Sequence, residues 1–84
     1  MASNKLEKIS LIQTKENEEV VIVSLLAGRI ATKRLADMGL VPGTKIKILR
    51  KAIFGPIEVE AKGSKLVLGR GLAAKIFVKY DDLS

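Results

Sequence analysis

The chain has 84 residues, a net charge of +6 at pH 7, and neither Cys nor His. This length predicts one small domain with a modest core, and the lack of Cys excludes disulfides and thiolate metal sites. The first ten residues are polar and do not resemble a signal peptide. Because every apolar stretch is too short to span a bilayer, we expect a cytoplasmic protein without direct membrane insertion.

The positive charge is concentrated in the middle of the chain. Residues 20–80 carry twelve Lys or Arg and three acids, whereas residues 1–19 carry three Lys and four acids. A basic body favours an acidic partner, such as a nucleic acid, an anionic lipid surface or an acidic protein face. The alternative is that the lysines serve solubility and protect sheet edges from pairing.

The N-terminal part predicts a tail followed by a buried strand. We expect residues 1–10 to form a flexible tail, with Leu11 and Ile12 as the first apolar anchors. After a polar loop, the β-branched run 19–26 predicts a strand that is buried on both faces for part of its length. Gly28 then helps to break this strand.

Residues 29–38 predict a helix, because they are good helix formers with one apolar face. The residues expected to face the core are Ile30, Ala31, Leu35 and Met38. Arg34 projects into the same arc, where its stem can lie along the core. Arg29, Lys33 and Asp37 are expected on the outer face of this helix.

The segment after this helix constrains the backbone strongly. Gly39 suits the left-handed residue that closes a helix, and Leu40 can supply the apolar contact that follows it. Residues 41–44 place Pro at the second and Gly at the third turn position, which is the type II pattern. The sequence therefore predicts a defined path from the helix into the next strand.

The remaining residues predict four more short strands, at 44–50, 57–61, 65–68 and 76–80. The first two of these strands flank a loop at residues 52–56, and a helical turn at 72–74 precedes the last strand. Leu49 and Arg50 break the alternation of the strand that contains them, which indicates a bulge or a change of burial. Glu58 and Glu60 are placed to face Lys45 and Lys47 across an antiparallel pair.

The elements together predict a mostly β fold. About five short strands with Gly-punctuated turns favour a small closed barrel, because closure removes the sheet edges. One α-helix is inserted after the first strand of this barrel, and the short helical turn comes before the last.

Four segments together resemble the FeoA family. They are residues 34–46, Gly55-Pro56-Ile57, Leu66-Val67-Leu68-Gly69-Arg70 and Ala73-Ala74-Lys75-Ile76. The resemblance implies an SH3-like β-barrel domain over residues 11–80, with a short C-terminal tail at 81–84. It also implies a small cytoplasmic protein of ferrous iron transport whose partner is the GTPase-containing cytoplasmic part of the membrane transporter FeoB.

The same fold also occurs in metal-dependent transcriptional regulators of the DtxR type. The alternative implied by the resemblance is therefore a stand-alone relative of the C-terminal domain of those regulators. The 84 residues leave no room for a helix-turn-helix domain, which favours the transport form.

The residue types do not favour catalysis, a cofactor or a tight metal site. Ferrous iron is usually held by His, Cys or carboxylates, and the acids of this chain are scattered. The serines have no His to activate them, and Gly69-x-Gly71 is too short for a dinucleotide fingerprint. We expect no enzyme activity, no cofactor and no tight iron site, although the family is associated with transition metal ions.

Candidate partner-binding residues come from the predicted helix and from the region around the 52–56 loop. They are Arg29, Lys33, Arg34, Arg50, Lys51 and Phe54. An exposed aromatic flanked by Arg is a typical protein-binding anchor, whereas the alternative is a solvated helix face and a Phe folded onto the core. A nucleic acid is the second candidate partner, but three aromatic residues offer few stacking platforms.

Overall fold

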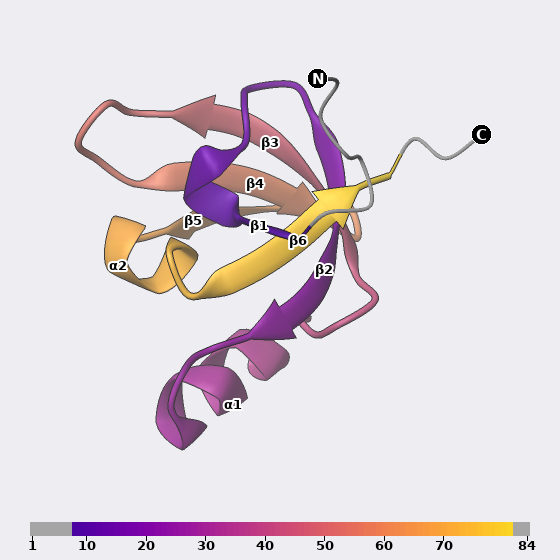
Figure 1. Cartoon of the computed structure of the whole chain (residues 1–84), viewed down its shortest axis with the longest axis vertical. Coiled ribbons are helices and arrows are strands. Elements are labelled where there is room, and N and C mark those ends of the chain that lie inside the picture. Colours follow the sequence, from indigo (N-terminus) through magenta and orange to yellow (C-terminus); the bar gives the residue numbers. More distant parts are fainter. Residues whose placement is uncertain (1–7, 82–84) are drawn as a thin grey trace.

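An antiparallel sheet, a projecting helix and a short second helix make up residues 8–81, the part that the computed structural model describes (Figure 1). In chain order the elements are β1 (Ile9–Ser10), the 3-10 helix η1 (Leu11–Gln13), β2 (Glu19–Leu25), α1 (Arg29–Asp37), β3 (Lys45–Lys51), β4 (Ile57–Ala61), β5 (Ser64–Leu68), α2 (Arg70–Ala73) and β6 (Ile76–Tyr80). The hydrogen-bonded order across the sheet is β1-β6-β2-β3-β4-β5. The last strand therefore lies beside the first long strand.

The core is built from the inward-facing side chains of the strands. Successive strand residues point to opposite faces, so alternation along β4 and β6, and along the first halves of β2 and β3, places every second side chain inside. The buried apolar residues are Leu11, Val20, Ile22, Leu35, Leu40, Ile46, Ile48, Ile57, Val59, Ala61, Leu68, Ala73, Ile76 and Val78. The mostly β, SH3-like fold that the sequence predicts is confirmed.

Several strand boundaries agree with the sequence prediction. β4 and β6 span the predicted residues, and the loop at 52–56 separates β3 from β4. The pairing of β3 with β4 shifts in register between Ile48 and Arg50, which confirms the predicted irregularity. Lys47 lies opposite Glu60, as expected, but Glu58 lies opposite Arg50.

The prediction of a closed barrel is wrong, because β1 and β5 remain the two edges of the sheet over residues 8–81. Residues 9 and 10, expected in the flexible tail, form β1 and pair with β6. β1 stops there because Ser10 caps η1: the Ser10 hydroxyl accepts from Ile12 N, and Ser10 N donates to Gln13 Oε1 at 2.9 Å. The rest of the predicted tails, residues 1–7 and 82–84, lies outside the described residues.

The end of α1 has the predicted geometry. Gly39 has φ +85°, and its N–H donates to Ala36 O at 2.9 Å, while Leu40 N donates to Leu35 O at 2.8 Å. These two bonds form a Schellman motif, which satisfies carbonyls that the end of a helix leaves free. Leu40 is fully buried and so supplies the expected apolar contact.

The turn between α1 and β3 is held by both main chain and side chain. Thr44 N donates to Val41 O at 3.0 Å, and Gly43 has φ +96°, as a type II turn requires. The buried Thr44 hydroxyl donates to Gly39 O at 3.0 Å and accepts from Val41 N. These contacts join the end of α1 to the beginning of β3.

The predicted core-facing side of α1 is wrong for two of its four residues. Leu35 is fully buried, but Ile30 is 79% exposed, and Met38, just beyond the helix, is also exposed. Ala31 is half-buried. The reason is the position of α1, which projects from the sheet at the bottom of Figure 1, so that the sheet covers one side of the helix only.

Candidate partner-binding surfaces

The six predicted partner-binding residues lie at two separate places. Arg29, Lys33 and Arg34 belong to α1, whereas the other three belong to the end of β3 and the loop that follows it. In Figure 1, α1 is at the bottom and the β3–β4 loop is at the upper left. The predicted residues therefore form two surfaces rather than one.

The first surface, here called the loop surface, consists of Arg50, Ile53 and Phe54. The Phe54 side chain is 93% exposed and Ile53 is 78% exposed. Arg50, at the end of β3, is also exposed. Phe54 is thus turned outward and does not fold onto the core.

Arg70, which belongs to α2, holds the β3–β4 loop in place. The Arg70 guanidinium donates to Ala52 O and to Gly55 O, each at 3.2 Å. The loop is also closed by Ala52 N, which donates to Pro56 O at 3.3 Å. A side chain at Gly55 would place its Cβ 2.9 Å from the Ala52 Cβ, so the loop is tightly packed at its base.

This role of Arg70 is not predictable from the local sequence. Its residue type and its neighbours Gly69 and Gly71 predict only a turn. The one available signal was its place in the Leu66–Arg70 segment, which contributes to the family resemblance.

Lys51 is engaged within the protein. Its ammonium group donates to Ile12 O at 2.6 Å and also to Thr14 O, while its main-chain N donates to Glu16 Oε2 at 2.9 Å. The Lys51 side chain is half-buried. Lys51 therefore joins the end of β3 to η1 and the turn after it, whereas its neighbour Arg50 is free to point outward.

The second surface, here called the α1 surface, combines aliphatic and basic side chains. It consists of Leu26, Arg29, Ile30, Lys33 and Arg34, all of which are exposed. Lys33 Nζ lies 3.9 Å from an Asp37 carboxylate oxygen one turn along the helix. Both side chains of this pair are well exposed, so the pair contributes little to stability.

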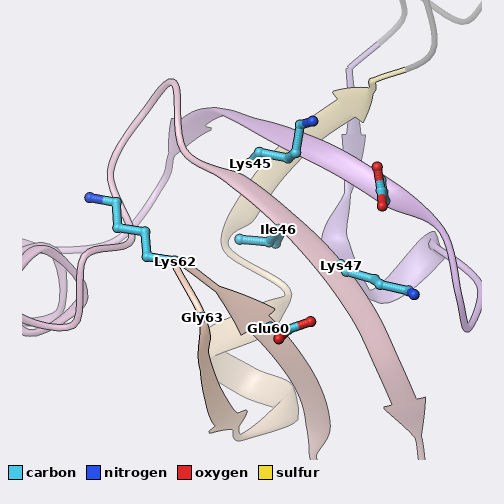
Figure 2. Close-up of a pocket in the computed structure, with 7 residues that line it drawn as sticks. Lys45, Ile46, Lys47, Glu60, Lys62 and Gly63 are labelled. Atoms are coloured by element: carbon cyan, nitrogen blue, oxygen red, sulfur yellow. The ribbon is translucent and has the colours of Figure 1, made fainter.

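A shallow hollow of about 210 Å³ lies over β3, near the β4–β5 turn (Figure 2). Its lining residues are Glu19, Lys45, Ile46, Lys47, Glu60, Lys62 and Gly63. Figure 2 shows the ammonium groups of Lys45, Lys47 and Lys62 pointing away from one another. Because the three cations do not converge, this hollow is poorly arranged to hold a small anion.

Lys45 has its own partner at the rim of this hollow. Its Nζ lies 3.0 Å from an Asp81 carboxylate oxygen, and not beside the β4 acids that the sequence suggested. The hydrogen bond and the negative charge of Asp81, with the nearby charge of Glu19, raise the pKa of Lys45 above its ordinary value.

Possible metal ligands are dispersed in the described part of the chain. Within residues 8–81, no three His, Cys, Asp or Glu side chains are grouped so that they could hold a metal ion. None of the helices in the same range is long and apolar enough to cross a bilayer.

We expect titration of the isolated protein with Fe²⁺ under anaerobic conditions to show no one-to-one binding in the micromolar range. The physical reason is that dispersed carboxylates, without His or Cys, make a weak ligand set for this ion. Isothermal calorimetry measures this directly. A saturable one-to-one isotherm with a micromolar Kd would contradict the expectation.

The known proteins that this chain is similar to point to one protein family. The FeoA domain model matches residues 9–80. A Methanocaldococcus jannaschii protein named as an Fe(2+) transport protein A is 45% identical over 65 residues, which cover 77% of this chain and 78% of that protein. The solution structure of a FeoA protein from Chlorobium tepidum matches with 35% identity and a TM-score of 0.82, covering 90% of this chain and 73% of that one.

Two further solved structures also match this chain. An iron uptake regulatory protein (FeoA) matches with 30% identity and a TM-score of 0.82, over 87% of this chain and 97% of that one. A manganese-dependent transcriptional repressor also has a TM-score of 0.82 but is 17% identical, and the match covers 88% of this chain and 42% of the repressor. The repressor therefore shares the fold, while the sequence and structure matches together show that the chain belongs to the FeoA family.

Proposed function

We propose that this protein is a non-enzymatic, cytoplasmic accessory protein of ferrous iron uptake that binds the GTPase-containing cytoplasmic part of a FeoB transporter. Family membership and the name of the M. jannaschii relative support a role in Fe²⁺ transport. The observation that carries the docking proposal is the loop surface, where Phe54 is 93% exposed beside the exposed Ile53. We propose the loop surface as the transporter-binding site.

The loop surface has the physical properties of a protein-binding anchor. When a partner covers an exposed aromatic side chain and an exposed aliphatic side chain, the loss of apolar surface from water lowers the free energy of the complex. Arg70 holds the main chain of the loop at two carbonyls, so less conformational entropy is lost when a partner orders the loop. Arg50 adds an exposed cation three residues before this apolar pair in the chain, and Arg together with aromatic residues is frequent among binding hot spots.

We expect the double variant Ile53→Ser/Phe54→Ser to bind the cytoplasmic part of FeoB about 10- to 30-fold more weakly than the unchanged protein. The reason is loss of the apolar area that the partner would cover. The measurement is a binding titration against the immobilised FeoB part, with GDP and with a GTP analogue. Because both side chains are exposed, the melting temperature should stay close to that of the unchanged protein.

The matched control is Val67→Ser, which removes an apolar side chain that is 60% exposed on β5. This variant should bind the FeoB part as tightly as the unchanged protein. Unchanged binding by the double variant would rule out the loop surface as the transporter-binding site. Equal weakening by Val67→Ser would show that the site is not confined to the loop.

A further inference from the structure

The α1 surface exposes aliphatic side chains that no other described part of the protein covers. Leu26 is 69% exposed and Ile30 is 79% exposed. Arg29, Lys33 and Arg34 are exposed on the same short helix. Since α1 projects from the sheet, this surface can approach a flat partner without a clash from the strands (Figure 1).

More cations lie around the same end of the molecule. Leu26 N donates to Lys75 O at 2.8 Å, which places the exposed Lys75 next to Leu26. At the other end of the helix, the Lys62 ammonium group lies close to Gly39. A Cβ atom placed on Gly39 would be 3.8 Å from Lys62 Nζ. α1 itself carries one acid, Asp37. The end of the protein that presents α1 therefore has a strong excess of positive charge.

Several of the acids are placed at the opposite end of β2 or beyond it. Glu19 begins β2, and Asp81 N donates to Glu19 O at 3.2 Å. Glu16 lies in the turn before β2 and accepts from Lys51 N, at the end of β3. Lysines lie beside these acids, since Lys47 is opposite Glu19 and Lys45 is paired with Asp81, so the charges there largely offset one another. An anionic partner is therefore attracted mainly to the α1 end, where the basic side chains outnumber the single acid of the helix.

We propose that the α1 surface docks this protein on the anionic lipid headgroups of a membrane surface. Aliphatic side chains beside basic residues are the composition of helices that lie in a bilayer interface. Each Lys or Arg near an anionic leaflet adds attraction, and the aliphatic side chains insert among the headgroups. Nine residues are too few to span a bilayer, so the contact is adsorption at the surface and not transmembrane insertion.

A bilayer fits this surface better than a nucleic acid does. Single-strand binding relies on aromatic platforms for base stacking, and Leu26 and Ile30 are aliphatic. Phosphate contacts alone would leave these two side chains in water. The proposal is also independent of the transporter, since it needs only the charge and the exposed apolar area of α1.

The test is co-sedimentation of the full chain with vesicles of phosphatidylcholine containing about one third phosphatidylglycerol, at an ionic strength near 0.1 M. We expect binding to these vesicles, little binding to pure phosphatidylcholine, and release as salt is raised. Arg29→Gln/Lys33→Gln should lower the partition coefficient about 25-fold, at about fivefold for each charge removed. Leu26→Asn/Ile30→Asn should also lower it, through loss of apolar insertion.

The matched control is Lys15→Gln/Lys47→Gln, which removes the same charge from residues outside α1. It should reduce binding much less than the α1 charge variant. An equal reduction would overturn the proposal, because binding would then follow net charge rather than the α1 surface. Absence of binding to the anionic vesicles, or equal binding to pure phosphatidylcholine, would also overturn it.

A second readout separates this proposal from the transporter proposal. The Ile53→Ser/Phe54→Ser variant should bind anionic vesicles like the unchanged protein, and the α1 variants should still bind the cytoplasmic part of FeoB. If the α1 variants lose FeoB binding and keep vesicle binding, α1 is a protein-docking surface and the lipid proposal is wrong. Failure of the loop variant to lose FeoB binding would affect only the transporter site.

Discussion

Replacement of Leu35 by alanine is expected to lower the free energy of unfolding by about 2–5 kcal/mol. Leu35 is the buried residue of α1 and is inaccessible to solvent. Its removal would leave a cavity between the helix and the sheet, and α1 would lose its main apolar contact with the core. Urea denaturation followed by circular dichroism measures the change.

Ile30→Ala is the matched control, since it shortens an aliphatic side chain on the same helix. Ile30 is 79% exposed, so its replacement should change the free energy of unfolding by no more than about 0.5 kcal/mol. A loss as large as that of Leu35→Ala would show that Ile30 is packed. It would then contradict the description of the α1 surface as free.

Lys51→Met is expected to lower the free energy of unfolding by about 1.5–3 kcal/mol. The variant keeps a long aliphatic stem but removes the ammonium group that donates to Ile12 O and Thr14 O. Those two carbonyls would lose a charged donor, and the contact between β3 and the N-terminal segment would loosen. The same denaturation experiment reports this change.

Arg50→Met tests whether the effect is specific to Lys51. Arg50 precedes Lys51 on β3 but is exposed, so its replacement should leave the free energy of unfolding within about 0.5 kcal/mol of the original. Equal effects of the two variants would show that the charge of this strand end matters and not the hydrogen bonds. A Lys51→Met protein as stable as the original would contradict the stabilising role of these hydrogen bonds.

Local patterns predicted the parts of the fold that depend on neighbouring residues. β4 is a clean alternation between a Pro-containing loop and a Gly-containing turn, and its bounds agree with the prediction. The end of α1 was predictable because Gly39 and Leu40 act within one turn of the helix. Such features need no knowledge of the rest of the chain.

The wrong predictions depend on which segments meet in space. Helical periodicity shows which residues share a face, but it does not show that only the Leu35 side of α1 meets the sheet. Closure of the barrel depends on whether β1 and β5, which are far apart in the sequence, pair with each other, and within residues 8–81 they do not. The hydrogen bonds of Lys51 to Ile12 O and Thr14 O were not predicted, because these acceptors lie 39 and 37 residues earlier in the chain.

The placement of the loop surface and the α1 surface at different ends of the molecule allows both to be occupied at once (Figure 1). A protein held at a bilayer through α1 searches for a membrane transporter in two dimensions, so the effective concentration of the loop at the transporter rises. If both proposed contacts form, their combined residence time would exceed that of either contact alone. The projection of α1 from the sheet would then make the molecule bivalent.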